Sequence, residues 1–514
     1  MTETRLAEPP AWVGEAVFYQ IFPDRFARSG RVPAPGPLEP WDSEPTVNGF
    51  KGGDLYGIVE HLDHLVDLGI TAIYLNPIFS SASNHRYHTF DYLAVDPLLG
   101  GDAGLRCLLD EAHARGIRVI LDGVFNHASR GFWPFHHVLE TGRHSPYRDW
   151  FYLHDEDLAA GRPLRAYAGE SLQEALTADW WESHAEGTQS LTTLGYRAWW
   201  DLPPLPKLNT DNPIVREYLM TVAEHWTRFG IDGWRLDVPG EITTPGFWEE
   251  FRQRVRAINP DAYIVGEIWQ ERGDLLDGRT YDGLMNYPLA AAIISFVPGG
   301  HLDPRVVAQH AEIERQTRPT DGAGFLERAE RVIGGYRPPF ARSLLGLVDS
   351  HDTPRFLSWC GGDRASLRLA WLVLLTMPGA PCIYYGDEVG MTGEMDPGCR
   401  GAFPWDESRW DHGLLETARM LIALRQATPA LRDVDFAPLA SDGMAVAYRR
   451  GRGDGSAIVA LNAGDDPAEL LVPGPAGASL VTIPGLPEAA IAPGDGGTLG
   501  IALPARSGTV VRAG

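Results

Sequence analysis

The sequence predicts a (β/α)8 barrel with a subdomain inserted after its third strand and an antiparallel β-sandwich domain at its C-terminal end. Three observations predict it. Short apolar runs alternate with helical patterns over most of the chain, which is typical of parallel βαβ units. Several of these runs end in polar or charged residues, as barrel strands do at the face where an active site is assembled. The chain has 514 residues, which is too long for one ordinary core and long enough for such a barrel and smaller domains.

Eight short apolar runs are the expected barrel strands. They occupy residues 17–22, 70–75, 117–121, 233–236, 263–265, 283–285, 344–348 and 382–385. Helical patterns between them cover residues 58–67, 107–115 and 213–229, and Pro213 suits a first helical turn, where its missing amide hydrogen is not needed. Because parallel strands of a barrel end at one face, the polar residues that follow these runs are expected to gather there.

The alternation breaks twice, and the breaks divide the chain. A long irregular stretch rich in aromatic residues, glycine and proline predicts an inserted subdomain at 125–212, between barrel segments at 1–124 and 213–430. Short strands between turns predict an antiparallel β-domain at 431–514, with strands at 444–448, 457–461 and 509–512. The tract GRGDG at 451–455 resembles part of a phosphate loop, but no helix follows it, so a hairpin turn is expected.

Composition narrows the class of protein. The formal net charge of −24 argues against nucleic acid or an anionic membrane surface as a partner. The four cysteines lack C-x-x-C spacing and indicate neither a disulfide framework nor a zinc site. The start MTETRLAEPPAW lacks the pattern of a signal peptide, and no apolar run is long enough to span a bilayer, so a cytoplasmic location is expected. No cofactor is implied, and the oligomeric state stays open.

Two carboxylates at the ends of successive strands suggest the chemistry. Asp237 ends the run GWRLD, and Glu267 ends YIVGE, the next run along the chain. Because neighbouring strands lie roughly 4.8 Å apart, these side chains would stand near the separation of about 5 Å that retaining glycoside hydrolysis requires. Arg235 lies two residues before Asp237, so it points to the same side of the strand and would keep that carboxylate ionised. Asp352, after the seventh run, brings a third acid.

Four blocks in a fixed order extend this pattern. They are DGVFNH at 122–127, GWRLDVPGE at 233–241, GEIW at 266–269 and LVDSHD at 347–352. In this order and spacing they resemble the α-amylase family of glycoside hydrolases, and the resemblance runs from VFYQIFPDRF at 17–26 to the C-terminal β-domain. It implies a retaining α-glycosidase that acts on an α-glucan oligosaccharide through a covalent glycosyl-enzyme intermediate.

The resemblance also implies a role for each matching residue. Asp237 would be the nucleophile, Glu267 the general acid/base, and Asp352 the residue that binds sugar hydroxyls and helps to stabilise the transition state. The other implied roles concern the sugar at subsite −1 and its surroundings: Arg235 orients Asp237, His127 and His351 donate hydrogen bonds, Tyr87 stacks under the ring with His88 beside it, and Asp122 and Asn126 are structural.

A narrower resemblance is to the branch that contains neopullulanase, cyclomaltodextrinase and maltogenic amylase. It is carried by LPKLN at 205–209, DPGCR at 396–400 and FPWDE at 403–407. It implies that Asp396 and Arg400 contact the sugar at subsite −2 and that Glu241 and Trp269 lie on the acceptor side. The implied reaction is hydrolysis of α-1,4 bonds in malto-oligosaccharides, cyclodextrins or pullulan, with α-1,6 cleavage and transglycosylation as open additions.

Two features of that branch are not expected here. Its N-terminal β-sandwich is not expected, because the first barrel strand begins at residue 17. Its calcium loop after the first strand reads ARSGRVPAPGPLEP, which has almost none of the six to eight oxygen ligands that calcium needs, and Asp54 alone remains of the pattern. No metal site is therefore expected.

Each singled-out residue also has a plain structural interpretation. Strand-end acids commonly cap helices or form ion pairs, the histidines and aromatics could be core residues, and Asp396 with Arg400 could be an ordinary loop ion pair. Other functions stay open as well. These are a 4-α-glucanotransferase or α-glucosidase, a non-catalytic barrel that binds a partner, and an unrelated metal-dependent barrel hydrolase.

Overall fold

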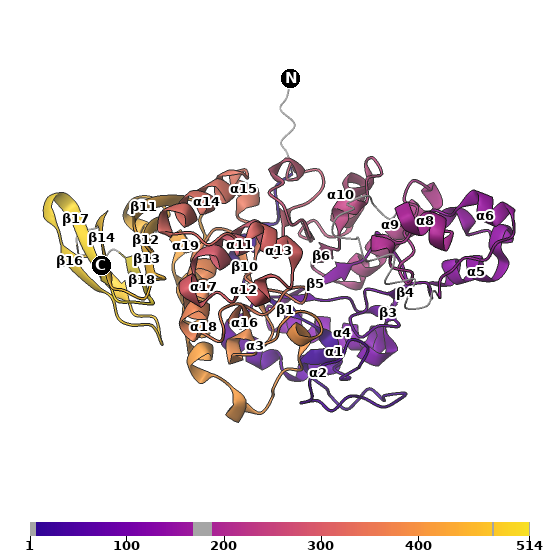
Figure 1. The fold of residues 1–514 in the computed structure, drawn as a ribbon, viewed down its shortest axis with the longest axis horizontal. Coiled ribbons are helices and arrows are strands. Elements are labelled where there is room, and N and C mark those ends of the chain that lie inside the picture. Colours follow the sequence, from indigo (N-terminus) through magenta and orange to yellow (C-terminus); the bar gives the residue numbers. More distant parts are fainter. Residues whose placement is uncertain (1–6, 168–187, 475–476, 513–514) are drawn as a thin grey trace, which may run out of the picture.

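The structure is a computed structural model, and it describes residues 7–167, 188–474 and 477–512. Figure 1 shows an elongated molecule with the barrel in the middle, the helices α5, α6 and α8 of the insertion at one end and the C-terminal sheets at the other. Among the helices of these described ranges, none has both the length and the apolar character that crossing a bilayer requires.

Eight parallel strands form the barrel, as the sequence predicts. Their hydrogen-bonded order is β8-β7-β6-β5-β2-β1-β10-β9. A parallel bridge between Met285 and Leu345 brings the two ends of this sheet together and closes it. The strands are β1 (Phe18–Ile21), β2 (Ala72–Leu75), β5 (Arg118–Gly123), β6 (Gly233–Leu236), β7 (Tyr263–Gly266), β8 (Gly283–Leu284), β9 (Leu345–Gly346) and β10 (Ala380–Tyr384).

Helices surround this sheet and pack apolar side chains against it, and α11 is buried on all sides. The longer ones are α4 (Gly101–Ala114), α9 (Pro213–Phe229), α10 (Phe247–Ile258), α11 (Tyr287–Phe296), α14 (Gly322–Gly334), α17 (Arg364–Thr376) and α18 (His412–Ala427). The shorter ones are α1 (Pro23–Phe26), α2 (Leu55–Glu60), α3 (Leu62–Leu68), α12 (Pro304–Val307), α13 (Ala311–Gln316), α15 (Pro338–Ala341), α16 (Phe356–Trp359) and α19 (Pro429–Arg432).

The single helix expected around residues 58–67 is in fact two helices. They meet at His61, which ends α2 and precedes α3. The His61 ring stacks on Trp405 at a centroid distance of 3.5 Å. The apolar pattern continues through the break at His61, so the sequence alone predicts one helix.

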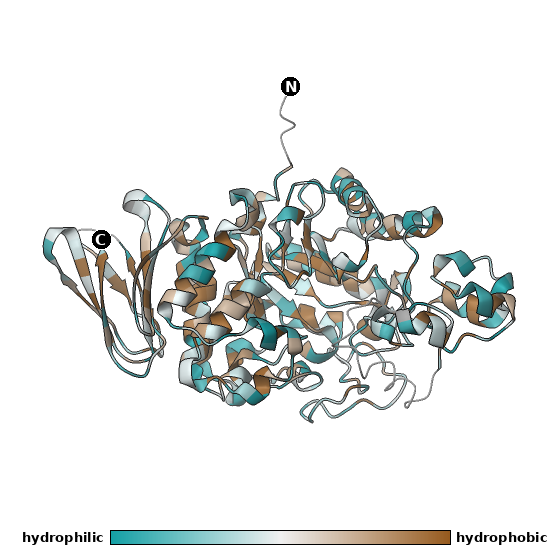
Figure 2. Cartoon of the chain, turned by 45° about the horizontal axis from the view of Figure 1, so that its top comes forward, coloured by the Kyte–Doolittle hydropathy of each residue, from teal (hydrophilic) through white to brown (hydrophobic). Residues whose placement is uncertain are grey.

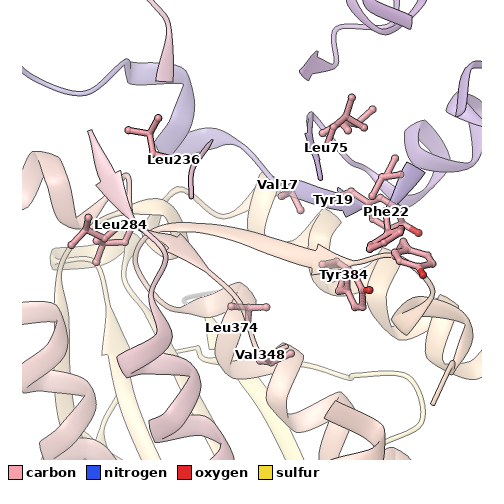
Figure 3. Packing of buried hydrophobic residues seen from close by; sticks show 14 of the residues in the cluster. Val17, Tyr19, Phe22, Leu75, Leu236, Leu284, Val348, Leu374 and Tyr384 are labelled. Carbon is pink, nitrogen blue, oxygen red and sulfur yellow. The ribbon is translucent and has the colours of Figure 1, made fainter. Parts of the chain in front are cut away.

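The core lies inside the barrel and between its strands and helices. Figure 2 shows hydrophobic residues gathered on the barrel strands and on the inner helix faces. Figure 3 shows strand residues such as Leu75, Leu236 and Leu284 in the same cluster as Leu374 of α17. All four of these leucines are at most 2% exposed. This close packing fixes the strand ends, and with them the residues that follow each strand.

Isolated bridges hold parts of the insertion together, and Ser129 N–H donates to Thr89 O at 3.0 Å, which joins the insertion to the hairpin after β2. Its described helices are α5 (Trp133–Thr141), α6 (Asp155–Ala159) and α8 (Thr188–Leu194), while β3 (Phe79–Ser81) and β4 (Thr89–Val95) form a hairpin after β2. Bridges join His127 to Lys207 and Phe151 to Leu208. The part of the expected insertion at 168–187 lies outside the described residues.

The C-terminal segment forms two antiparallel sheets around their own small core, which confirms the predicted β-sandwich. One sheet contains β11 (Phe436–Asp442), β12 (Ala445–Arg450), β13 (Ala457–Asn462), β15 (Ser479–Val481) and β18 (Ser507–Arg512); the other contains β14 (Ala468–Pro473), β16 (Ala490–Pro493) and β17 (Thr498–Leu503). The GRGDG tract joins β12 to β13, which pair antiparallel, so it is the predicted hairpin turn.

Two buried arginines satisfy the carbonyl groups at the end of α17. Arg425 of α18 donates to Leu375 O and Met377 O, at 3.0 Å each. Arg450 of β12 donates to Thr376 O at 2.6 Å and to Asp435 O at 3.1 Å. Because the last carbonyls of a helix have no partner within it, these contacts join the β-domain to the barrel at a point that water cannot reach.

Replacing Arg450 with methionine is expected to destabilise the protein through this junction. The change leaves buried carbonyl groups without donors, which lowers the free energy of unfolding by about 2–4 kcal/mol. Arg452 on the same hairpin is the matched control, because its side chain is 79% exposed and pairs only with Asp435 at the surface. Thermal unfolding of both variants checks this, and equal shifts of the midpoint would contradict it.

Candidate active site

Two acids stand side by side where β6 and β7 end. The strands pair in register from Gly233 with Tyr263 to Leu236 with Gly266, so Asp237 and Glu267 follow the last pair together. The Glu267 backbone N–H donates to Leu236 O at 3.0 Å, which continues the ladder to this point. The exposed fractions are 6% for Asp237 and 7% for Glu267.

One guanidinium holds these two acids and a third. Arg235 is fully buried and contacts Asp237 Oδ1 at 2.9 Å through one nitrogen and Glu267 Oε2 at 3.1 Å through the other. The first nitrogen also contacts both oxygens of Asp122, at 3.0 and 3.1 Å. Asp237 Oδ2 has no partner among the described residues, so this oxygen is available to a ligand.

Burial works against the negative charge of two of these acids. Burial raises the pKa of Asp237 well above its usual value, although Arg235 acts in the opposite direction. Burial likewise raises the pKa of Asp122 to about 6. The Arg235 guanidinium is the group that offsets this cost, because a cation in contact favours the ionised form of a carboxyl.

A chain of hydrogen bonds behind the acids fixes the state of His351. Gln20 at the end of β1 donates its amide N–H to His351 Nδ1 at 2.7 Å, so this nitrogen accepts and the ring proton lies on Nε2. His351 Nε2 lies 2.6 Å from the Tyr87 hydroxyl, which in turn donates to Asp122 Oδ2 at 2.8 Å. Burial lowers the pKa of His351 well below its usual value, so the ring is neutral.

Asp352 lies beside this histidine and is more exposed than Asp122, Asp237 and Glu267. Its side chain is 30% exposed, with Oδ2 at 3.2 Å from His351 Nε2 and Oδ1 at 3.3 Å from Arg400. Arg400 also contacts Asp396 at 3.1 Å and donates to the His351 carbonyl at 2.9 Å. Asp396 and Arg400 are therefore an ion pair that continues the group of charges outward from Asp352.

Aromatic stacking contacts hold His127 and Trp269 in place. His127 is fully buried and stacks on Trp199 at 4.6 Å, and burial lowers its pKa to about 3. His127 Nε2 has no partner in the described parts of the chain, so it is free to meet a ligand. Trp269 donates its indole N–H to Glu267 Oε1 at 3.2 Å and stacks on Tyr287 at 3.6 Å.

The remaining predicted residues lie further from the acids. Glu241 follows β6 and pairs with Lys207 of the insertion at 3.4 Å. His88 meets His85 edge to face at 4.9 Å, and the His85 ring lies 5.7 Å from that of Tyr87. Within the described residues, Glu241 and His88 make no direct hydrogen bond or ion pair with Asp237 or Glu267, and the roles implied for them stay predictions.

Sequence reasoning missed several partners. Gln20, Asn76 and Lys207 belong to the surroundings of the acids, and Trp199 and Tyr287 support His127 and Trp269. A signal existed for the first three, because Gln20 is a polar residue within a barrel strand, Asn76 follows one, and Lys207 lies within LPKLN. Tyr287 comes two residues after the expected strand at 283–285, whereas Trp199 follows no expected strand.

No metal site takes part in this arrangement. Within residues 7–167, 188–474 and 477–512, no group of three or more His, Cys, Asp or Glu side chains is placed to hold a metal ion. Asp54, the one acid that remained of a calcium pattern, uses both oxygens for protein donors: Oδ1 accepts from Gly57 N at 2.8 Å and Oδ2 from Ser29 N at 3.0 Å. It caps α2.

This chain is similar over most of its length to known proteins. The model of the α-amylase catalytic domain matches residues 20–414. A cyclomaltodextrinase of Geobacillus thermopakistaniensis is 40% identical over 472 residues, which are 91% of this chain and 72% of that protein. Neopullulanase 2 of Thermoactinomyces vulgaris is 42% identical over 425 residues, which are 82% of this chain and 64% of that protein.

A solved structure extends the similarity to the whole described fold. The debranching enzyme of Nostoc punctiforme in its native form matches with a TM-score of 0.85 and 44% identity. The match covers 99% of this chain and all of the other.

Proposed function

The chain belongs to the α-amylase family of glycoside hydrolases, and from this premise we propose that it hydrolyses α-1,4-glucosidic bonds of malto-oligosaccharides with retention at the anomeric carbon. The observation that supports this most directly is the pair Asp237 and Glu267, which lie on neighbouring strand ends and contact the same Arg235 guanidinium. Adjacent strands place such a pair close to the separation of about 5 Å that retaining enzymes use.

In the first step Asp237 is the nucleophile. Its Oδ2, which has no partner among the described residues, forms a bond to the anomeric carbon, while Arg235 holds Oδ1. The bond from that carbon to the leaving oxygen breaks, and Glu267 gives this oxygen its proton. Asp352 stabilises the positive charge on the sugar ring, and His127 donates a hydrogen bond from Nε2 to a sugar hydroxyl. The Nε2–H of His351 lies toward Tyr87 and Asp352, so this histidine holds those two residues in place.

In the second step water replaces the departed sugar. Glu267, now ionised, takes a proton from water, and the resulting oxygen attacks the anomeric carbon as Asp237 leaves. The charges balance, since Glu267 regains the proton that it lost. A sugar hydroxyl in place of water would give transglycosylation, and Trp269 beside Glu267 is placed to hold such an acceptor.

The relatives define which substrates to test. Similarity to a cyclomaltodextrinase, a neopullulanase and a debranching enzyme supports cyclodextrins, pullulan and α-1,6 branches as further substrates. The competing functions are a predominant 4-α-glucanotransferase and an α-glucosidase. A non-catalytic barrel is disfavoured, because all three acids are present and adjoin a single network of charges.

The product pattern decides among these. Maltotriose, pullulan and β-cyclodextrin are each incubated with the full chain, and NMR follows the anomeric form of the first product. We expect maltose and glucose from maltotriose, with the newly formed reducing end first in the α configuration, and opened rings from the cyclodextrin. Products longer than maltotriose at early times would make transfer the main activity, and an inactive chain on all three would refute the proposal.

The hydrogen bond from Gln20 to His351 gives a first test of the surroundings. Gln20→Leu removes the donor that keeps the His351 proton on Nε2, so kcat on an aryl maltoside is expected to fall about tenfold or more. Asn84→Leu is the control, because this buried amide donates only to the carbonyls of Val47 and Gly49. If kcat fell equally in both variants, the loss would reflect disturbed packing and not the hydrogen bond to His351.

A further inference from the structure

A second pair of aspartates lies buried behind the loop that carries His351 and Asp352. Asp349 follows β9 and Asp387 follows β10, and each residue is 3% exposed. Their side chains hydrogen-bond to each other. Neither residue takes part in the steps proposed above, so the contact between them needs its own explanation.

Each of these two carboxyls has one oxygen with a donor and one without. Asp349 Oδ2 accepts from Phe356 N–H at 2.6 Å, and Asp387 Oδ1 accepts from Arg355 at 2.8 Å. The second oxygens, Asp349 Oδ1 and Asp387 Oδ2, have no donor from any residue of the described ranges. Ionised carboxylates only accept hydrogen bonds, so a bond between these two side chains requires a proton on one of them.

The charges around the pair also favour a state in which one of the two carboxyls is protonated. Arg355 is fully buried and is the cation in direct contact with the pair, so it balances one negative charge and not two. Other titratable groups that face the pair are Glu388, an additional acid, the thiol of Cys382 and the hydroxyl of Tyr19, and burial raises the pKa of both Cys382 and Tyr19. The rings of Tyr384 and Tyr385 cover Arg355 at 4.3 and 4.9 Å, and burial raises the pKa of both.

The pair also closes the loop between residues 349 and 356. Asp349 binds the backbone of Phe356 across this loop, and Arg355 N–H donates to Gly393 O at 2.9 Å. Arg355 further donates to the Tyr385 carbonyl at 2.8 Å, next to Asp387. The end of the loop is therefore tied to the segment after β10 by these buried hydrogen bonds, in addition to those that Gln20 and Arg400 make with His351.

We propose that Asp349 and Asp387 share one proton and that this protonated pair positions the loop that presents His351 and Asp352. Asp387 is the carrier of the proton, because burial and the adjacent charge of Asp349 raise its pKa well above the usual value. The shared proton rests on geometry and charge within the fold. The positioning role rests on the function proposed for Asp352, and both aspartates are positioning residues that do not touch the substrate.

Infrared difference spectroscopy of the full chain tests the shared proton. At pH 7 the wild type is expected to show a carbonyl stretch of a buried carboxylic acid that Asp387→Asn removes. Asp96→Asn is the matched control, because Asp96 is equally buried but both of its oxygens have donors, Arg86 and Leu98 N–H. If Asp387→Asn fails to fold, Asp349→Asn gives the same comparison. An unchanged acid band in the variant that folds would overturn the proposal.

The pH dependence of unfolding is an independent test, and its sign follows from the raised pKa. Asp387 is protonated in the folded chain and ionised in the unfolded chain above the usual aspartate pKa of about 4, so unfolding releases a proton. Rising pH then shifts the wild type toward unfolding by about tenfold per pH unit relative to Asp387→Asn. The midpoint of thermal unfolding of the wild type should fall relative to this variant from pH 5 to 7. Parallel curves would contradict the shared proton.

Kinetics test the positioning role. Asp387→Ala should lower kcat on an aryl maltoside by about tenfold or more, whereas Asp387→Asn, which can donate to Asp349, should restore most of it. Equal kcat values for the two variants would refute positioning by the hydrogen bond. If the wild type is inactive on every α-glucan, the proposed function fails, but the infrared and unfolding results still decide whether the proton is shared.

Discussion

Asp237→Asn is expected to abolish turnover of malto-oligosaccharides while leaving the protein folded. The amide cannot form the bond to the anomeric carbon, so kcat should fall by roughly 10⁴- to 10⁶-fold. Stability should stay the same or rise. Burial and the nearby acids disfavour the charge of Asp237, as the raised pKa of this group shows, and the amide carries no charge.

Asp232→Asn is the matched control for this variant. Asp232 precedes the same strand at its opposite end, where it accepts from Val119 N–H at 2.8 Å and pairs with Arg118 at 3.0 Å. It is therefore expected to lose stability and keep kcat, the reverse of Asp237→Asn. Initial rates with maltotriose and the midpoint of thermal unfolding measure both. An Asp237→Asn variant that keeps more than a hundredth of the wild-type rate would remove Asp237 from the role of nucleophile.

Features that depend on short stretches of sequence could be predicted. The eight strands, the β-domain and the acids that follow β6 and β7 all come from local patterns, because a parallel strand shows its apolar run and its polar end within a few residues. Arg235 was predicted to face Asp237 for the same reason, since residues two apart share one side of a strand.

Features that depend on closure of the barrel could not be predicted from the sequence. Gln20 of β1 and His351, which follows β9, are 331 positions apart and meet because β10 pairs with both of these strands in the closed sheet, which no local pattern contains. The same is true of Asp349 and Asp387, whose strands also lie side by side. Lys207 and Trp199 depend on the path of the insertion, whose irregular sequence has no periodicity from which that path could be derived.

Glu267→Gln should have an effect that depends on the leaving group. Glutamine keeps the size of the side chain but carries no acidic proton, so cleavage of a maltosyl–glucose bond should slow by about 10²- to 10⁴-fold. A dinitrophenyl maltoside leaves without protonation, so its first step should lose little rate. The glycosyl-enzyme should then accumulate, because no base remains to activate water. Azide, which needs no deprotonation, should restore turnover.

The neighbouring acid Glu271 supplies the control for that experiment. It lies four residues beyond Glu267 in the loop after β7 and pairs with Arg331 at the surface, so Glu271→Gln should leave both substrates unaffected. The informative quantity is the ratio of the two rate losses in Glu267→Gln. A dinitrophenyl maltoside that loses as much rate in its first step as maltotriose would show that Glu267 does not deliver the proton.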